Sequence, residues 1–396
     1  MKEKLFFSAD PGRAPHPSPP RSNQSNQGRG RTLLVMSLAL LVVLIVVLSW
    51  VAFQLYAGTE KLSTQNASSP HLIPTRQAHV PTSTIANATP VPQVTPPRSD
   101  SAMTYDPLHH VVLLFGGTTT EATDAQQTNE TWAWNGHGWK QLHPASSPPA
   151  LQGTMVYDAA SQRVILFLYQ VQSAGKVANE MWSWDGTTWQ QLYPETMPEA
   201  VGASMAYDEA RHEIVLFGGG VPSMRTVTLI NTTWTWDGMN WRRQYPATSP
   251  SPRSGAAMTY DAAHQQIILY GGAGDGSGAS SVASETWIWD GMTWQQHNGA
   301  GIPFQDQNVR LVYDSVTQQT LLFGATNSDA TWTWNGSQWV RTTAHGAPTT
   351  PYLSASAYDN AAQSVIVYAA QGDSKMGATP VSQTWIWNGT VWKLQP

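Results

Sequence analysis

The 396-residue chain contains no cysteine. Disulfide bonds, thiolate zinc sites and cysteine nucleophiles are therefore excluded, whatever the redox compartment. Charged side chains are also scarce, at 12% of the residues, compared with about 25% in typical globular domains. The net charge of −5 divides unevenly, because residues 1–31 carry six basic and two acidic side chains (+4) and the remainder therefore carries −9. A negative balance of this kind argues against nucleic acid as a partner.

Long hydrophobic runs are absent, with one exception. Residues 33–53 are almost wholly aliphatic, and no charged side chain stands between Arg31 and Glu60. A helix of this length spans about 30 Å, the thickness of the hydrocarbon core of a bilayer. A cleaved signal peptide and a buried core helix are the alternatives, but the run is too long for the first and too continuous for the second. We expect one transmembrane α-helix, a signal anchor within residues 32–56.

The segments on either side of this helix differ in composition. Residues 1–31 form a basic tail with few apolar side chains, which predicts disorder. Residues 57–95 are rich in Ser, Thr and Pro, as expected of an extended and disordered stalk. Because the basic residues precede the helix, the tail is predicted to be cytoplasmic and residues 96–396 extracytoplasmic. The sequence thus predicts a single-pass protein of the cell membrane.

Tryptophan is abundant and regularly placed. Six copies of Trp-x-Trp-Asn/Asp-Gly-x-x-Trp, beginning with Trp132, contain 18 of the 19 tryptophans. Alternation puts the first two rings of each copy on one face of a strand, Asn-Gly or Asp-Gly favours a tight hairpin turn, and the last ring returns on the partner strand. We expect these rings to pack between repeats, with sugar stacking as the alternative. The structural positions are Trp134, Trp139, Trp184, Trp189, Trp236, Trp241, Trp289, Trp294, Trp334, Trp339, Trp387 and Trp392.

A second motif recurs with the same period. Tyr-Asp begins at residues 105, 157, 207, 260, 313 and 358, with spacings of 52, 50, 53, 53 and 45 residues. Each unit reads as a strand ending in Tyr-Asp, a polar turn, an apolar strand, a variable loop and the tryptophan hairpin. A period near 50 with four short strands per unit is typical of a β-propeller blade. Symmetric recurrence favours a scaffold role for Tyr-Asp, with a ring of six carboxylates as the functional alternative.

From about residue 96 to the end, the chain resembles the kelch-repeat family in the variety found in galactose-oxidase central domains. Glycine pairs follow the apolar strand at 116/117, 218/219 and 271/272, and the other units depart from this pattern, with Leu168-Tyr169, Gly324-Ala325 and Ala369-Ala370. The resemblance implies an all-β, six-bladed kelch-type β-propeller. With no strand left over at either end, the ring is expected to close by side-chain packing between the first and last blades.

The resemblance also bears on chemistry. The copper site of galactose oxidase uses a cross-linked cysteine, which this chain lacks, and no histidine maps onto its ligands. The Asp box of sialidases resembles Asp237-Gly238-Met239-Asn240-Trp241, but one intervening residue is missing. The histidines at 109, 110, 212 and 264 fall at similar positions of different units, so we expect them to be solvated and expect no metal site and no cofactor.

The loops that precede the tryptophan hairpins vary in length, whereas the other turns do not. Variable loops on a rigid scaffold are common binding surfaces. The candidate ligand-binding residues there are Glu121, Asp124, Lys176, Arg225, Asp275, Asp373 and Lys375. No catalytic grouping is evident among them, so the sequence favours a non-catalytic binding module for a protein or glycan. A carbohydrate-active propeller enzyme and the ectodomain of an envelope sensor remain alternatives.

Overall fold

The fold is known from a computed structural model, which describes residues 95–119, 125–172, 175–223, 226–274, 284–297, 309–325, 328–348, 352–371 and 381–395. The basic tail, the expected membrane helix and most of the stalk lie outside these residues. Across the described ranges, no helix is long and apolar enough to cross a membrane. The described chain is all β.

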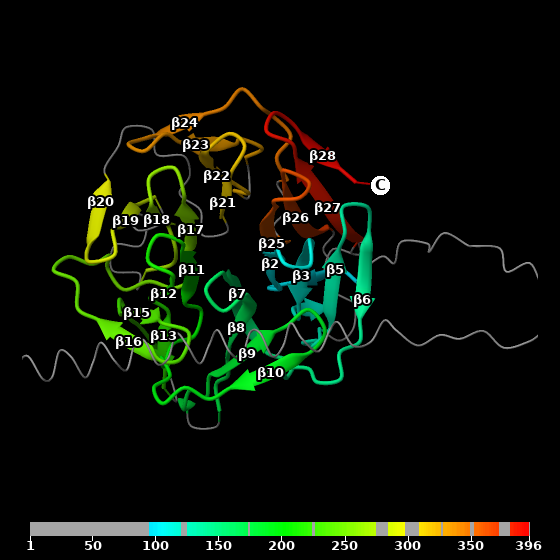
Figure 1. Ribbon diagram of the computed structural model, residues 1–396. Helices are drawn as coiled ribbons and strands as arrows, with labels where there is room; N and C mark the ends of the chain where they lie inside the picture. The colour runs from blue at the N-terminus through cyan, green and yellow to red at the C-terminus, as the bar shows by residue number, and fades with distance from the viewer. Residues whose placement is uncertain are drawn as a thin grey trace, which may run out of the picture. The chain divides into compact units, whose positions relative to one another are not determined.

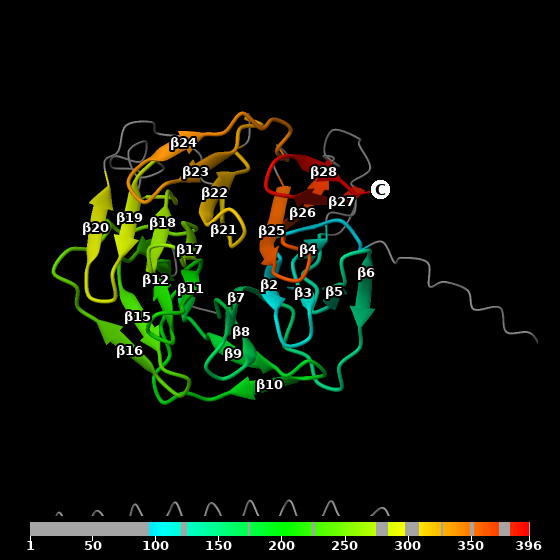
Figure 2. The same cartoon turned by 45° about the horizontal axis from the view of Figure 1, so that its top comes forward.

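Six four-stranded antiparallel sheets, blades 1 to 6, are arranged radially about one axis (Figure 1), and the tilted view keeps the same order (Figure 2). Blade 1 consists of β2 (Ala102–Asp106), β3 (Val111–Phe115), β5 (Thr131–Trp134) and β6 (Trp139–Leu142). Blade 2 consists of β7 (Gln152–Asp158), β8 (Arg163–Tyr169), β9 (Glu180–Trp184) and β10 (Trp189–Leu192). Blade 3 consists of β11 (Ser204–Asp208), β12 (Glu213–Phe217), β15 (Thr233–Trp236) and β16 (Trp241–Gln244).

Blade 4 consists of β17 (Ala257–Asp261), β18 (Gln266–Tyr270), β19 (Thr286–Trp289) and β20 (Trp294–His297). Blade 5 consists of β21 (Arg310–Asp314), β22 (Gln319–Phe323), β23 (Trp332–Trp334) and β24 (Trp339–Arg341). Blade 6 consists of β25 (Tyr352–Asp359), β26 (Ser364–Gln371), β27 (Val381–Trp387) and β28 (Trp392–Leu394). Two short pairs stand outside the blades: β1 (Arg98–Ser99) with β4 (Thr118–Thr119), and β13 (Gly220–Pro222) with β14 (Val227–Leu229). The predicted six-bladed propeller is confirmed.

The first strand of each blade is innermost, and its alternating side chains contact both neighbouring blades. In β2, Met103 and Tyr105 pack with Ala355 and Ala357 of blade 6, while Ala102 packs toward blade 2. The second strands are apolar because both of their faces are covered, and Val112 to Leu114 of β3 have no exposed surface. The core is therefore a set of six interfaces between blades, and no single blade has a core of its own.

Each interface has the same aromatic centre. Within a blade, the last two tryptophans pair across the hairpin, with ring centroids 5.2–5.6 Å apart in all six copies. The last tryptophan also packs against the aromatic residue at the fifth position of the preceding blade's second strand, as Trp189 does with Phe115 at 5.5 Å. Such aromatic pairs contribute about 0.5–1.5 kcal/mol beyond area burial.

The indole N–H of that last tryptophan donates a hydrogen bond to the preceding blade. The acceptor is the hydroxyl of the threonine before the first tryptophan of that blade, at 2.8–3.0 Å in five of the six interfaces. In the interface between blades 2 and 3 the acceptor is instead the sulfur of Met181, 2.8 Å from Trp241 Nε1. The indole N–H groups of Trp134, Trp236, Trp289, Trp334 and Trp387 are buried without a hydrogen-bond partner. The last tryptophan of each blade thus has a hydrogen-bond acceptor for its indole N–H, whereas these five do not.

Blades 1 and 6 meet through the same contacts as any other neighbours. Trp139 of blade 1 lies 5.7 Å from the ring of Tyr368 in blade 6, and the Tyr368 hydroxyl donates to the carbonyl of Pro96. Every blade takes its four strands from one continuous segment. The ring therefore closes by side-chain packing and not by a shared strand, as the sequence predicts.

The glycine pattern explains where the second strands end. Strands β3, β12 and β18 stop after five residues, and the glycine pair that follows each has positive φ, as in Gly116 (68°) and Gly117 (95°). In blades 2 and 6, which lack the pair, the second strands continue for seven and eight residues. The hairpin after each Trp-x-Trp is a four-residue loop, in which Asn135 Oδ1 accepts the amide N–H groups of His137 and Gly138 and only the glycine after Asn135 has positive φ.

Candidate functional site

The two ends of the ring are built differently. Because strand direction alternates, the turns between first and second strands and those between third and fourth strands lie at one end, here called the turn end. The connections between second and third strands leave from the opposite, loop end. The turn end repeats one structure six times, whereas the described loops of blades 1 to 3 differ from one another at the loop end.

The aspartates of Tyr-Asp build the turn end. Asp106 Oδ1 accepts the amide N–H groups of Leu108 and His109, at 3.0 and 3.2 Å, which is an Asx-type turn. The six aspartates are 0–3% exposed. Each of these turns ends on a residue with φ of 50–56°, namely His110, Gln162, His212, Gln265, Gln318 and Gln363. The aspartates are therefore occupied by their own turns.

Some side chains of these turns also reach the next blade. His109 Nδ1 lies 2.8 Å from Asp106 Oδ2, and the His109 ring lies where a Cβ on Gly186 of blade 2 would stand. His264 makes the same pair with Asp261 at 2.9 Å and packs against Gly336 of blade 5. These two histidines are exposed, as expected, and in addition they contact both their own turn and the neighbouring blade. Gly186 and Gly336, which have no Cβ, thus leave space for the histidine ring of the preceding blade.

The six tyrosines of Tyr-Asp lie between the blades, around the axis. The hydroxyl of Tyr207 accepts the amide N–H of Ala160 in the preceding blade, at 3.1 Å. Burial raises the pKa of all six tyrosines, and the aspartate of the preceding blade raises it further, as Asp359 does for Tyr105. The tyrosines remain neutral at physiological pH and lie in a negative electrostatic environment.

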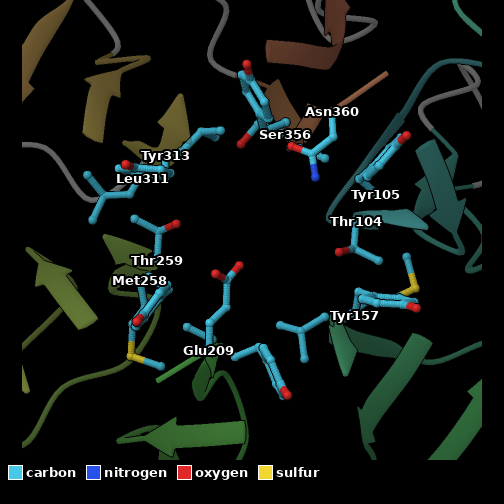
Figure 3. A pocket seen from close by; sticks show the side chains of 18 of the residues that line it. Thr104, Tyr105, Tyr157, Glu209, Met258, Thr259, Leu311, Tyr313, Ser356 and Asn360 are labelled. Atoms are coloured by element: carbon cyan, nitrogen blue, oxygen red, sulfur yellow. The ribbon is translucent and has the colours of Figure 1, made fainter. Parts of the chain in front are cut away.

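The inner strands enclose a channel of about 650 Å³ that runs to the turn end (Figure 3). Its wall contains the tyrosines and, two residues before them, Met103, Met155, Met205, Met258, Leu311 and Ser356. Two residues after the tyrosines stand Pro107, Ala159, Glu209, Ala262, Ser315 and Asn360. The volume is typical of small-molecule sites, which occupy about 300–1,000 Å³.

Glu209 is the one carboxylate among the residues that line this channel. Its side chain extends from blade 3 toward the middle of the channel (Figure 3). Burial raises its pKa, and the nearby charge of Asp208 raises it further. Sequence reasoning missed Glu209, although the signal was present: the equivalent positions of the other five repeats hold no charged residue.

The loop end is where the sequence placed its candidate ligand-binding residues. Of these, Lys176 lies among the described residues, and it is exposed, in a loop closed by the bridge between Val171 and Val177. The others lie outside the described residues: Glu121, Asp124, Arg225, Asp275, Asp373 and Lys375. The structure therefore does not test whether the seven residues come together.

The loops of blades 2 and 3 contact each other at this end. A Cβ on Gly175, in the blade 2 loop, would stand 2.6–2.9 Å from the backbone of Ser223. Ser223 follows β13, whose hairpin with β14 is the blade 3 loop. Val171 and Val227 are 50% and 60% exposed on these two loops. The two loops thus form one continuous surface, which includes Lys176.

Metal binding has no support in the described part of the chain. Within those ranges, no group of three or more His, Asp or Glu side chains could hold a metal ion.

Comparisons with known proteins identify no relative by sequence. No protein-family model matches the chain, and no curated protein matches it. Among solved structures, that of YjhT aligns with 76% of this chain and 84% of its own, at 13% sequence identity and a TM-score of 0.37. This likeness is too distant to carry an argument about function.

Proposed function

We propose that the chain is a kelch-type propeller, anchored in the cell membrane by residues 33–53, that acts outside the cytoplasm as a non-catalytic binding module for a protein or glycan. The observation that carries the proposal is the contrast between the two ends of the ring. Six turns of one design hold the turn end together, while the described loops of blades 1 to 3 form three different structures at the loop end.

The loop surface of blades 2 and 3 is the proposed recognition surface. It combines exposed valines with the charge of Lys176, a mixture of apolar and polar groups that suits a protein or glycan partner. It also rests on a rigid support, because the strands beneath it are buried between blades. A preorganised surface loses little conformational entropy on binding.

An enzyme that acts on carbohydrate is less well supported by the geometry. Glycoside hydrolysis generally requires two carboxyl groups, an acid and a base or nucleophile, within about 5–10 Å of each other. Among the residues that line the described channel, only Glu209 carries a carboxylate, and the six aspartates behind the wall accept hydrogen bonds from their own turns. A single carboxylate is better suited to binding than to this chemistry.

The test is a glycan-array and cell-surface pulldown screen with the full chain in detergent or nanodiscs. Saturable binding should weaken at least tenfold when Lys176→Ala and Val227→Ser are combined. The matched control is Met239→Ser, because Met239 is 74% exposed at the turn end. Binding that is lost in the control and kept in the loop variant would place recognition at the turn end and refute the proposed surface.

A further inference from the structure

The channel departs from sixfold symmetry at one position in a way that packing does not require. Two residues after each tyrosine, the repeats place small or uncharged side chains, and blade 3 alone places a carboxylate. None of the described residues forms a hydrogen bond or ion pair with Glu209. Arg211, two residues along, is instead paired with Asp208 at 2.8 Å and also bonds the carbonyl of Asp290. Among the described residues, the carboxylate of Glu209 in the channel thus has no cationic partner.

The surroundings of Glu209 favour a positively charged ligand. Six buried aspartates stand behind the channel wall, and His109, Arg211 and His264 each pair with one of them. The other three, Asp158, Asp314 and Asp359, accept hydrogen bonds from turn amides. Low-dielectric walls with one sign of charge concentrate that potential inside a cavity. The channel therefore attracts cations.

Polar and apolar side chains share the wall of the channel about equally. The hydroxyls of Tyr105 and Tyr157 are turned away from the middle of the channel (Figure 3). The rings, the side chains of four methionines and Leu311 contribute to the apolar half of the wall. Aromatic rings attract ammonium groups through their faces, and thioethers adapt to irregular apolar shapes. The apolar half of the wall suits a cation with an apolar body, and one carboxylate supplies too few ligands for a metal ion such as Ca²⁺, which needs about 6–8 oxygen ligands.

From the single carboxylate, the negative surroundings and the mixed polar and apolar wall, we propose that the channel binds a small organic cation, a primary or quaternary ammonium compound, with Glu209 as its counter-ion. Thr104, Thr259 and Asn360 line the same cavity and supply hydrogen-bonding groups for a polar substituent. This site is separate from the loop surface proposed above, so either proposal can fail without the other.

Choline is a suitable probe, because it has a quaternary ammonium group, a short body and one hydroxyl. Calorimetry with the full chain in detergent should give 1:1 binding with a Kd of millimolar or below. Glu209→Gln should weaken binding at least tenfold, while Glu199→Gln, at an exposed glutamate outside the channel, should not change it. The neutral analogue 3,3-dimethyl-1-butanol should bind at least tenfold more weakly than choline. No binding by the wild-type protein, or equal binding by the neutral analogue, would overturn the proposal.

A second readout locates the ligand without any substitution. With methyl-labelled methionine, choline should shift the NMR signals of Met103, Met155, Met205 and Met258 in the channel. The signals of Met239 and Met292, 74% and 79% exposed outside it, should stay in place. Shifts confined to these two methionines would show that choline binds elsewhere and would overturn the assignment to the channel.

Discussion

The indole N–H of Trp139 in blade 1 donates to the hydroxyl of Thr384 in blade 6, at 2.8 Å across 245 residues of sequence. The equivalent bonds in the other interfaces join residues about one repeat apart, as Trp189 and Thr131 do across 58 residues. The same local contact therefore serves between successive blades and also closes the ring. In this hydrogen bond, closure differs from the four other interfaces with a threonine acceptor only in the length of chain that it joins.

Thr384→Val is expected to destabilise the propeller by about 1–3 kcal/mol, because it leaves the buried indole N–H of Trp139 without an acceptor. Thr233→Val is the matched control, since it removes the same bond between blades 3 and 4. Thermal unfolding followed by tryptophan fluorescence should show similar losses for both variants. A much larger loss for Thr384→Val would mean that the closing interface carries stability beyond this shared contact.

The cleft between blades 5 and 6 should accept a larger side chain. Thr317 occupies the position of His109 and His264, and a cavity of about 200 Å³ remains between it and Trp387. Thr317→His should fill this space and stabilise the protein by about 0.5–2 kcal/mol, as cavity filling commonly does. The reverse substitution, His264→Thr, should lower the melting temperature. An unchanged or lower melting temperature for Thr317→His would contradict the packing role of these histidines.

The blade number and strand order were predictable because their signals are local. Tyr-Asp marks an Asx-type turn, and the tryptophan spacing sets the hairpin in which Trp134 faces Trp139. The channel has no local signal, because it forms only when six turns from distant parts of the chain meet. Glu209 could have been found only as a departure from the repeat, after the repeats had been recognised as one ring.

The buried guanidinium of Arg98 gives the next prediction. It lies 2.6 Å from Glu130, which also accepts the indole N–H of Trp132 at 3.0 Å. Although burial raises the pKa of Glu130, the hydrogen bonds from Arg98 and Trp132 outweigh it and hold that pKa below its ordinary value. The ionised carboxylate therefore stabilises the fold above the unfolded-state pKa, and this contribution is lost as the pH falls through the lowered value.

Glu130→Gln should cost about 3 kcal/mol at pH 7, since it leaves Arg98 buried without its counter-ion. The cost should shrink as the pH falls below about 4, where the wild-type carboxylate becomes protonated. Melting temperatures of both proteins measured from pH 7 to pH 3 provide the test. Parallel pH profiles would show that Glu130 does not contribute through its charge.

Glu209 should show the opposite pH dependence. Burial and the charge of Asp208 raise its pKa, so the ionised form is less favourable in the folded protein than in the unfolded chain. Stability is therefore lost as the pH rises through the unfolded-state pKa, about 4.3, to the raised folded value.

Glu209→Gln should raise the free energy of unfolding at pH 7, by less than about 1 kcal/mol because solvent screens part of the charge. Below about pH 4 the two proteins should melt alike. A Glu209→Gln variant that is more stable than the wild type but no longer binds choline is the result expected if the carboxylate is retained for a ligand. A variant that is less stable at pH 7 would instead assign Glu209 a structural role.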